Sequence, residues 1–219
     1  MSRKATKIVL IATMAVLCII GGTLAFDYFW EMNNIPEYID APYEAREDLD
    51  NTAPTESEIL AHIVAPDRPR YMSISRIGVN NARVMELGTV GGSNQLADPV
   101  NVHDVGWYHG SARPGQPEPH KMAGLYDGHN TGMYSLGVFY RLGELVYGDQ
   151  IVIERGDGAV FTYSVRESSL VAAAEVNMAM MMQTAVAGVE GLNIITCGGN
   201  WDEVAQTYTH RVLIRAILI

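Results

Sequence analysis

The chain has 219 residues, a formal net charge of −10 and a hydrophobic fraction of 48%. Its length and apolar content suffice for one core of ordinary size. Because no basic patch with interleaved aromatic residues is present, the sequence argues against a nucleic-acid partner.

The N-terminal segment predicts a membrane anchor. Residues 8–26 form a run of 19 residues without a charge, and a helix of that length, at about 1.5 Å per residue, crosses a hydrocarbon layer of about 30 Å. Three basic residues precede the run and acidic residues follow it. The positive-inside bias therefore places residues 1–7 in the cytoplasm and the rest outside, in a single-pass protein of the cell membrane. A cleaved signal peptide is the alternative, but the length of the run favours a retained anchor.

Residues 27–65 predict an acidic extracytoplasmic linker. Between residues 27 and 58 there are ten acidic residues, one basic residue and three prolines, with little apolar periodicity. Such a composition is typical of a solvated stalk. Within it we expect a short helix over Thr55–Ile63, with Thr55 as its N-cap and Glu58 completing a capping box.

Residues 66–219 predict one mostly β domain. Short runs that alternate apolar and polar residues are separated by loops rich in glycine and proline, a pattern that favours a barrel or a sandwich. Only residues 135–145 and the methionine-rich residues 176–186 have a helical pattern. The expected strands are 71–77, 82–87, 149–155, 159–165, 191–196 and 208–218.

Cys197 is the first candidate for chemistry. It is one of two cysteines, and the other, Cys18, lies inside the apolar run. Outside the cytoplasm a cysteine with no second cysteine to pair with is exposed to oxidation, so its retention favours a chemical role. Residues 192–199 predict a buried strand that ends at a glycine turn, which would bring Cys197 to the rim of a sheet. A small buried hydrophobic residue is the alternative interpretation.

A thiol that attacks an acyl group needs a base and a donor to the oxyanion. Of the six histidines, His129 stands out, because it lies in a glycine-containing loop after an apolar segment. His62 falls in the linker helix, where we expect it to be solvated, and His103, His109 and His120 are expected at the surface. The histidines lack the tight spacing of metal ligands. Arg211 and Arg215 lie on one face of the last strand by alternation, and for either of them a structural ion pair is the alternative.

These residues occur in an order that resembles the sortases, cysteine transpeptidases of bacterial cell surfaces, and the match is closest to class F. The resemblance extends over residues 66–219. The segments that carry it are Gly106-Trp107-Tyr108, Arg113-Pro114-Gly115, Gly128-His129, Val138–Leu145 followed by Gly148-Asp149, Leu192–Asp202, and Tyr208-x-x-Arg211.

The chain departs from the family pattern at three places. Asn193 replaces the threonine that many sortases carry four residues before the cysteine. The approach to the histidine, Leu125-Tyr126-Asp127, and the insertion Thr131–Leu136 are also unusual.

The resemblance implies a sortase-type closed β-barrel with a few short helices, preceded by one transmembrane helix. It implies that Cys197 is the nucleophile, His129 the general acid/base and Arg211 the residue that stabilises the oxyanion or positions the substrate. Thr196, Met180 and Met181 would contribute to substrate binding, although a core-facing helix is an equal alternative for the methionines. No cofactor and no metal is implied.

The implied activity is cleavage of an LPxTG-like sorting signal through a thioacyl intermediate. The protein would then be transferred to an amine acceptor, such as a peptidoglycan precursor or a pilin lysine. The implied partners are surface proteins or pilins that carry the signal, together with that acceptor. Two alternatives stay open: a hydrolytic cysteine peptidase on the same fold, and a non-catalytic surface-binding barrel. An L,D-transpeptidase is excluded, because its Ser-His-Gly-Cys motif is absent.

Overall fold

The computed structural model describes residues 49–90, 96–115 and 122–219. The chain divides into residues 1–39 and 40–219, and all described residues belong to the second unit. The expected membrane span 8–26 and residues 27–48 of the expected linker lie outside the described residues. Within the described ranges, no helix combines the length and the hydropathy needed to cross a bilayer.

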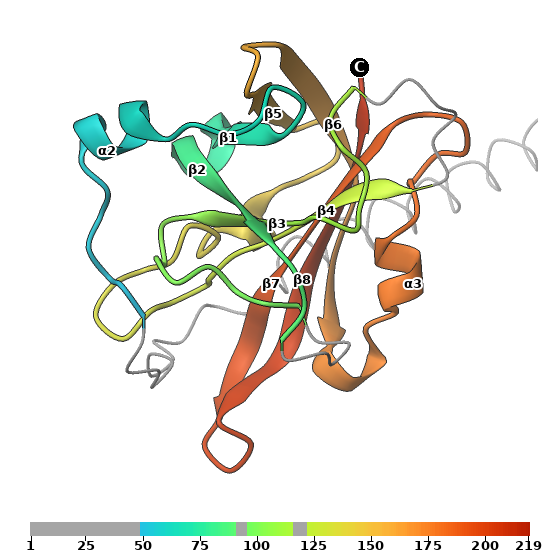
Figure 1. The fold of residues 1–219 in the computed structure, drawn as a ribbon. Coiled ribbons are helices and arrows are strands. Elements are labelled where there is room, and N and C mark those ends of the chain that lie inside the picture. The colour runs from blue at the N-terminus through green and yellow to red at the C-terminus, as the bar shows by residue number, and fades with distance from the viewer. Residues whose placement is uncertain (1–48, 91–95, 116–121) are drawn as a thin grey trace, which may run out of the picture. The chain divides into compact units, whose positions relative to one another are not determined.

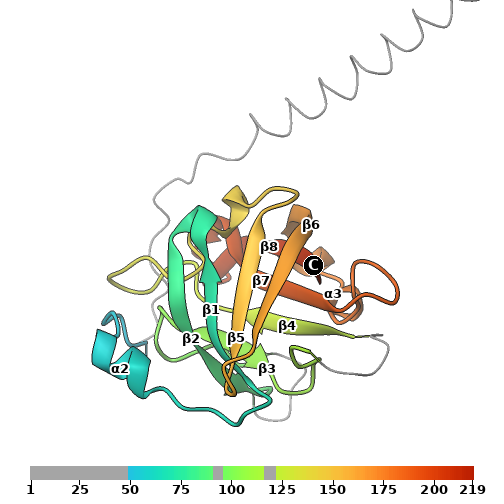
Figure 2. The same ribbon diagram turned by 90° about the horizontal axis from the view of Figure 1, so that it is seen from above.

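The described residues form a closed barrel of eight strands in the order β1-β2-β3-β4-β7-β8-β6-β5 (Figures 1 and 2). This confirms the expected mostly β, closed-barrel architecture with a few short helices. The strands are β1 (Pro69–Ile74), β2 (Val79–Leu87), β3 (Val105–Tyr108), β4 (Ala123–Asp127), β5 (Gln150–Arg155), β6 (Val160–Ala172), β7 (Gly191–Asp202) and β8 (Thr207–Leu218).

Two of the neighbouring strand pairs are parallel. β2 pairs in parallel with β3, and β4 pairs in parallel with β7, whereas the remaining pairs are antiparallel. β1 pairs with both β2 and β5, which closes the sheet. In Figure 1, β7 and β8 run side by side as the longest pair and end in a hairpin below the barrel.

Alternation along β7 and β8 produces two hydrophobic clusters. Ile194 and Ile214 point into the barrel and belong to its main core, together with the buried aromatic residues Trp107 and Tyr126. Their sequence neighbours Ile195 and Leu213 belong to a second cluster. Because successive side chains of a strand point to opposite faces, this second cluster covers the outer face of β7 and β8.

The helices are short. α2 (Glu56–Ala61) has Thr55 as its N-cap and a complete capping box with Glu58, which confirms the expected helix start. His62 follows α2, is half-buried, and its Nε2 lies 3.0 Å from the carbonyl oxygen of Val84. The expectation that His62 is solvated is therefore wrong. The described part of the expected linker contacts the barrel, while the domain boundary itself stays a prediction.

Residues 135–145 do not form the expected α-helix. They fold as turns and a 3₁₀ helix over Leu142–Glu144, because hydrogen bonds to distant backbone groups replace the local ones. The N–H of Val138 donates to Val102 O at 2.8 Å, and that of Phe139 donates to His129 O at 3.0 Å. The methionine-rich segment is helical only over Met178–Met181, which is α3.

Strand β7 does not end at the expected glycine turn. It continues through Gly198 and Gly199 to Asp202, paired with β8, and its register shifts between Gly198 and Trp201. Gly199 has a φ of +74°, so the glycines serve a β-bulge instead of a turn. β3 and β4, which were not among the expected strands, are short and largely buried.

Candidate active site

Cys197 lies on the outer face of the barrel, opposite an arginine. It is a reduced, half-buried residue of β7, and its register partner on β8 is Arg211. Directly opposed residues of an antiparallel pair project to the same face with Cβ atoms about 4.5–5.5 Å apart. The pairing therefore places Arg211 beside Cys197 on the face that carries the second hydrophobic cluster.

His129 follows the strand on the other side of β7. β4 runs parallel to β7, with Asp127 paired with Ile195. His129 lies two residues after Asp127, and Cys197 lies two residues after Ile195. The hydroxyl of Thr196 donates to the carbonyl oxygen of Gly128 at 2.7 Å, which fixes the start of the histidine loop to β7. The structure thus brings all three predicted catalytic residues to one edge of the barrel.

The ring of His129 is held by a backbone carbonyl. The residue is 5% exposed, and its Nε2 lies 2.7 Å from Pro99 O. A carbonyl oxygen can only accept a hydrogen bond, so this contact requires the proton on Nε2. In the neutral ring, Nδ1 is then the atom that can accept a proton from a nucleophile.

The two arginines of β8 have different surroundings. Arg211 is half-buried, and its Nη1 donates to the carbonyl oxygens of Tyr208 and His210 at 2.9 and 2.8 Å. Arg215 is 9% exposed, pairs with Glu167 at 2.8 Å, and donates to the backbone carbonyl oxygen of Thr184 at 3.1 Å. The structural ion pair that was the alternative role for Arg215 is therefore present. Only Arg211 stands opposite the cysteine.

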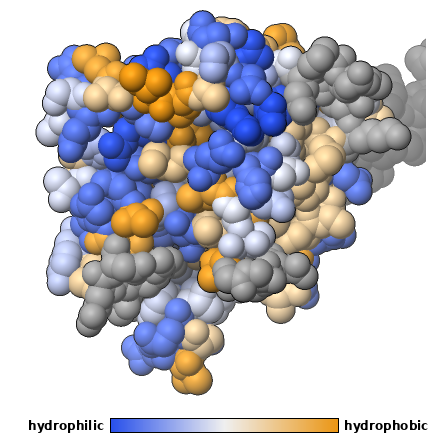
Figure 3. Space-filling view, viewed as in Figure 1, coloured by the Kyte–Doolittle hydropathy of each residue, from blue (hydrophilic) through white to orange (hydrophobic). Residues whose placement is uncertain are grey.

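The residues predicted to bind substrate lie at different depths. Thr196 is buried. Met181 has no exposed surface and joins Leu213 in the outer cluster, whereas Met180 is half-buried beside it. Figure 3 shows weakly hydrophobic surface over α3. Met181 thus packs the segment onto the barrel, and Met180 is better placed to contact a peptide; their roles in binding stay a prediction.

Asn193 was noticed in the sequence as a departure, and the structure gives it a function in the fold. It lies on the outer face of β7, paired with Arg215. Its Nδ2 donates to Met181 O at 2.7 Å and to Gln183 O at 2.9 Å. Together with Arg215, Asn193 fastens the end of the α3 segment to the sheet.

Asp127, the last residue of the unusual segment before the histidine, forms a carboxyl pair with Asp98. Asp127 is 8% exposed, and its Oδ2 is buried without a donor among the described residues. Burial raises the pKa of Asp127, and the negative charge and hydrogen bond of Asp98 raise it further, while nearby His129 acts in the opposite direction. Gly106 leaves room for this carboxyl, because a Cβ there would lie 2.0 Å from Asp127 Oδ1.

Of the remaining described histidines, His62, His103 and His109 contact backbone oxygens elsewhere, whereas Nδ1 of His210, next to Arg211 on β8, lies 2.8 Å from Thr209 Oγ1. His103 Nε2 lies 3.4 Å from Asn51 O, and His109 Nδ1 lies 3.2 Å from Leu87 O. Within residues 49–90, 96–115 and 122–219, no group of three or more histidine, cysteine or acidic side chains is placed to hold a metal ion. His120 lies outside the described residues.

Solved structures with a similar fold are sortases. Sortase C1 of GBS pilus island 1 matches with a TM-score of 0.51 and 17% identity, over 72% of this chain and 66% of that chain. The pilus-related sortase C of Group B Streptococcus gives 0.51 and 17%, over 82% and 79%. Sortase C1 from Streptococcus suis gives 0.50 and 19%, over 70% and 74%. The match thus spans just under two thirds of the length of the first of these proteins.

No curated protein matches the chain. The profile of the sortase domain matches residues 72–219, which is more than half of the sequence. That match includes the candidate histidine, cysteine and arginine. The chain therefore belongs to the sortase family.

Proposed function

We propose that the protein is a membrane-anchored cysteine transpeptidase of sortase class F. It would cleave an LPxTG-like sorting signal through a thioacyl intermediate and transfer the released protein to an amine acceptor at the cell wall or on a pilin. The observation that carries this proposal is the register pairing of Cys197 with Arg211, with His129 at the end of the adjacent strand. The ordered motif series is the support for class F.

In this proposal each of the three residues performs one step. The sulfur of Cys197 attacks the carbonyl carbon of the scissile peptide bond, and Arg211 donates hydrogen bonds to the oxyanion that forms. Among the described residues, the contacts of Arg211 use three of its five N–H donors. Donors therefore remain for the oxyanion.

His129 is the acid and base of this scheme. Because Pro99 holds the Nε2 proton, Nδ1 takes up the thiol proton and passes it to the departing amine. The C–N bond breaks and a thioester to Cys197 is left. An incoming amine attacks that thioester, His129 accepts the proton of the amine, and the thiol is regenerated with a new amide bond.

The acceptor decides between transfer and hydrolysis, since water attacking the same thioester would release the protein. A membrane anchor at residues 8–26 would favour transfer, because a sorting-signal protein and a lipid-linked acceptor held at the same bilayer meet at a raised effective concentration.

The test is to incubate the full chain with a panel of sorting-signal peptides, with and without added amines. We expect an amide product that requires the amine, and a thioester to Cys197 that mass spectrometry detects. In Cys197→Ala, both should vanish while the fold is retained, because Cys197 is a half-buried residue on the outer face of β7 and lies outside the barrel core.

The matched control is Cys18→Ala, which removes the other cysteine of the chain and should leave turnover unchanged. Turnover of a peptide by Cys197→Ala would contradict the proposal. A hydrolysis product that added amines do not alter would favour the peptidase, and no product with any peptide would favour the binding barrel.

A further inference from the structure

The chain that precedes α2 is joined to the loop before β3. Asp50 and Asn101 form a parallel bridge, in which the N–H of Asp50 donates to Val100 O and the N–H of Val102 donates to Asp50 O, both at 2.9 Å. We call residues Leu49–Thr52 the bracket. Leu49, its first residue, is 8% exposed, so the bracket is anchored in the fold by an apolar side chain.

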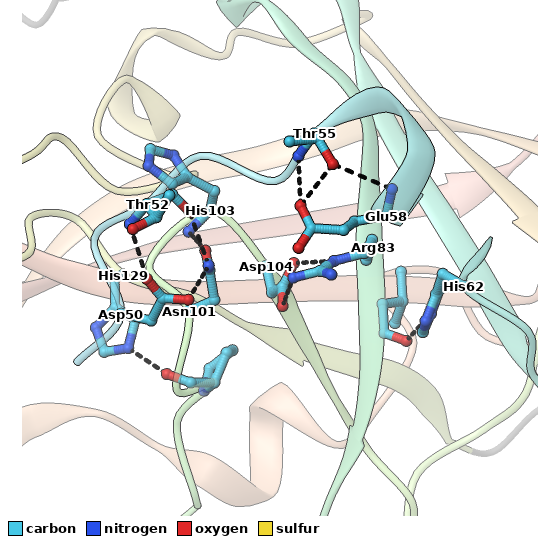
Figure 4. Close-up of polar contacts among 12 residues, drawn as sticks. Asp50, Thr52, Thr55, Glu58, His62, Arg83, Asn101, His103, Asp104 and His129 are labelled. Atoms are coloured by element: carbon cyan, nitrogen blue, oxygen red, sulfur yellow. Dashed lines mark hydrogen bonds and ion pairs between the residues drawn. The ribbon is translucent and has the colours of Figure 1, made fainter. Parts of the chain in front are cut away.

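Side chains reinforce this junction. Nδ2 of Asn101 donates to Asp50 Oδ2 and to Thr52 O, both at 2.9 Å, and the N–H of Thr52 donates to Asp50 Oδ1 at 2.9 Å. These hydrogen bonds lower the pKa of Asp50, so its carboxylate is ionised at neutral pH. Figure 4 shows Asp50, Thr52 and Asn101 in contact with one another, with His129 nearby.

The next residue of the bracket reaches a second loop. Oδ1 of Asn51 accepts from the N–H of Tyr134 at 3.1 Å and from the hydroxyl of Ser135 at 3.4 Å. A Cβ on Gly132 would lie 2.2 Å from this same oxygen, so the approach of Asn51 requires a glycine there. The second loop is the insertion that sets this chain apart from the family pattern.

Both loops hold His129. The first loop supplies Pro99, whose carbonyl oxygen accepts from the imidazole Nε2 at 2.7 Å, and Val100, the next residue, is bound by the bracket. The second loop follows His129, and Gly137, directly after the loop, packs against the histidine backbone: a Cβ on Gly137 would lie 2.1 Å from His129 O. The bracket therefore touches the two segments that fix the ring and the backbone of His129.

We propose that Leu49–Thr52 is a positioning element of the active site, in which Asp50 and Asn51 hold the two loops at the separation that keeps the Nε2–H of His129 on the Pro99 carbonyl. The expected effect on turnover rests on the proposed function. The expected effect on the His129 tautomer does not.

The fold itself should survive without these side chains. The two loops are also joined directly, because the N–H of Val138 donates to Val102 O at 2.8 Å, and the barrel core lies elsewhere. Removing a bracket side chain should therefore shift the loops slightly. A misplacement of about 1 Å in a catalytic group can cost on the order of 100-fold in rate.

The experiment uses four variants of the full chain. Asn51→Ala removes the contacts to the second loop, and Asp50→Ala removes the side-chain contacts to the first loop. Asn51→Asp keeps the two acceptor contacts. Asn80→Ala is the matched control, because Asn80 is an exposed asparagine with one local hydrogen bond, to Gly78 O at 3.2 Å. For each we would measure kcat and KM with a sorting-signal peptide, and the His129 tautomer by ¹⁵N NMR, assigned with His129→Gln.

In Asn51→Ala and Asp50→Ala we expect a fall in kcat of about 10- to 100-fold, a KM within about twofold of the parent and a mixed His129 tautomer. Asn51→Asp should restore most of kcat, and Asn80→Ala should change nothing. A fixed Nε2–H tautomer and unchanged kcat in both alanine variants would overturn the proposal. So would equal losses of kcat and thermal stability with an unchanged tautomer and no rescue by aspartate.

If the parent chain turns over no peptide, the proposed function has failed. The tautomer comparison still decides the role of the bracket in that case. Mixed His129 tautomers in the alanine variants would support the proposed role, and the same tautomer as in the parent chain would contradict it.

Discussion

Arg211 and Arg215 occupy the same face of β8, yet only one of them stands beside the thiol. Four residues along an extended strand are about 13 Å at about 3.3 Å per residue, so both cannot reach one oxyanion. Arg215 is bound to Glu167 and to backbone oxygens of the α3 segment. Its surroundings account for its burial without any catalytic role.

We expect Arg211→Lys to lose most of kcat, because an ammonium cannot reproduce the planar donors of a guanidinium. Arg215→Lys should retain kcat but lose about 1–3 kcal/mol of unfolding free energy, since buried acceptors lose a donor. Kinetics with one peptide, together with urea unfolding of both variants, checks this. An inactive Arg215→Lys variant together with an active Arg211→Lys variant would assign the catalytic role to Arg215 instead.

Asp127 makes the stability of the fold depend on pH. Its folded pKa is raised above the ordinary value of 3.8 by burial and by Asp98. The folded state then binds the proton more tightly than the unfolded state, so the contribution of this group is fully present below pH 3.8. It is lost as the pH rises through the folded pKa, where a buried carboxylate must form.

Asp127→Asn keeps a neutral side chain at every pH and can donate to Asp98. We expect it to raise the unfolding free energy by about 1–3 kcal/mol at pH 8, with the gain shrinking toward pH 4. Urea midpoints between pH 4 and 8 measure this. Asp157→Asn is the control, and it should lower the unfolding free energy, because Arg155 stabilises the ionised carboxylate and lowers the pKa of Asp157 to about 2. A gain that does not depend on pH would contradict our assignment.

For single residues, the sequence predicts those that belong to a linear motif, and the structure places Cys197, His129 and Arg211 on neighbouring strands and loops. The sequence does not predict Asp98 or Asn51 as neighbours of the site. Both lie in segments distant from the motif, and they approach His129 only through loop contacts that no periodicity encodes.

Polar contacts to β7 and β8 help to fix the position of the α3 segment. α3 itself is short, from Met178 to Met181, and helices shorter than about 12 residues are marginal by themselves. Asn193 binds two of its carbonyl oxygens, and Met181 is its buried contact with the barrel. A segment held in this way can present Met180 at a fixed height above the sheet.

We expect Met181→Ala to lower the unfolding free energy by about 2–5 kcal/mol, because it leaves a cavity in the outer cluster. Met180→Ala should cost much less stability but raise KM for a sorting-signal peptide. Thermal unfolding and peptide kinetics separate the two. If Met180→Ala lowers stability and leaves peptide selectivity unchanged, the methionines serve packing alone.

Elements were predictable where periodicity was strong, as in β5 and the second half of β8. The helix expected over residues 135–145 was wrong, because the spacing of Phe139, Leu142 and Leu145 imitates a helix while their backbone is bound to the histidine loop and its neighbours. The short strands β3 and β4 are buried on both faces and therefore show no alternation.

For the whole molecule, the pattern of short strands indicated a barrel or a sandwich, but not the order of the strands. The parallel neighbours β4 and β7 are separated by β5, β6 and α3. No local pattern specifies such a pairing, since it depends on how the intervening chain folds back. The family resemblance, and not periodicity, provided the expectation that His129 and Cys197 meet.

The parallel pairing of β4 with β7 also bears on the order of events in folding. Ala123 and Gly191 are partners, and closing a loop of about 70 residues is entropically costly, so contacts of this separation form slowly. Since His129 lies two residues after β4 and Cys197 lies on β7, the base should reach the nucleophile only when the barrel closes. In refolding from urea, catalytic activity should return with the slowest phase of Trp107 burial, and activity that precedes it would contradict this order. If the chain is exported as we propose, a newly translocated molecule would display a thiol without its base, and it could not form a thioester with a neighbouring protein before folding is complete.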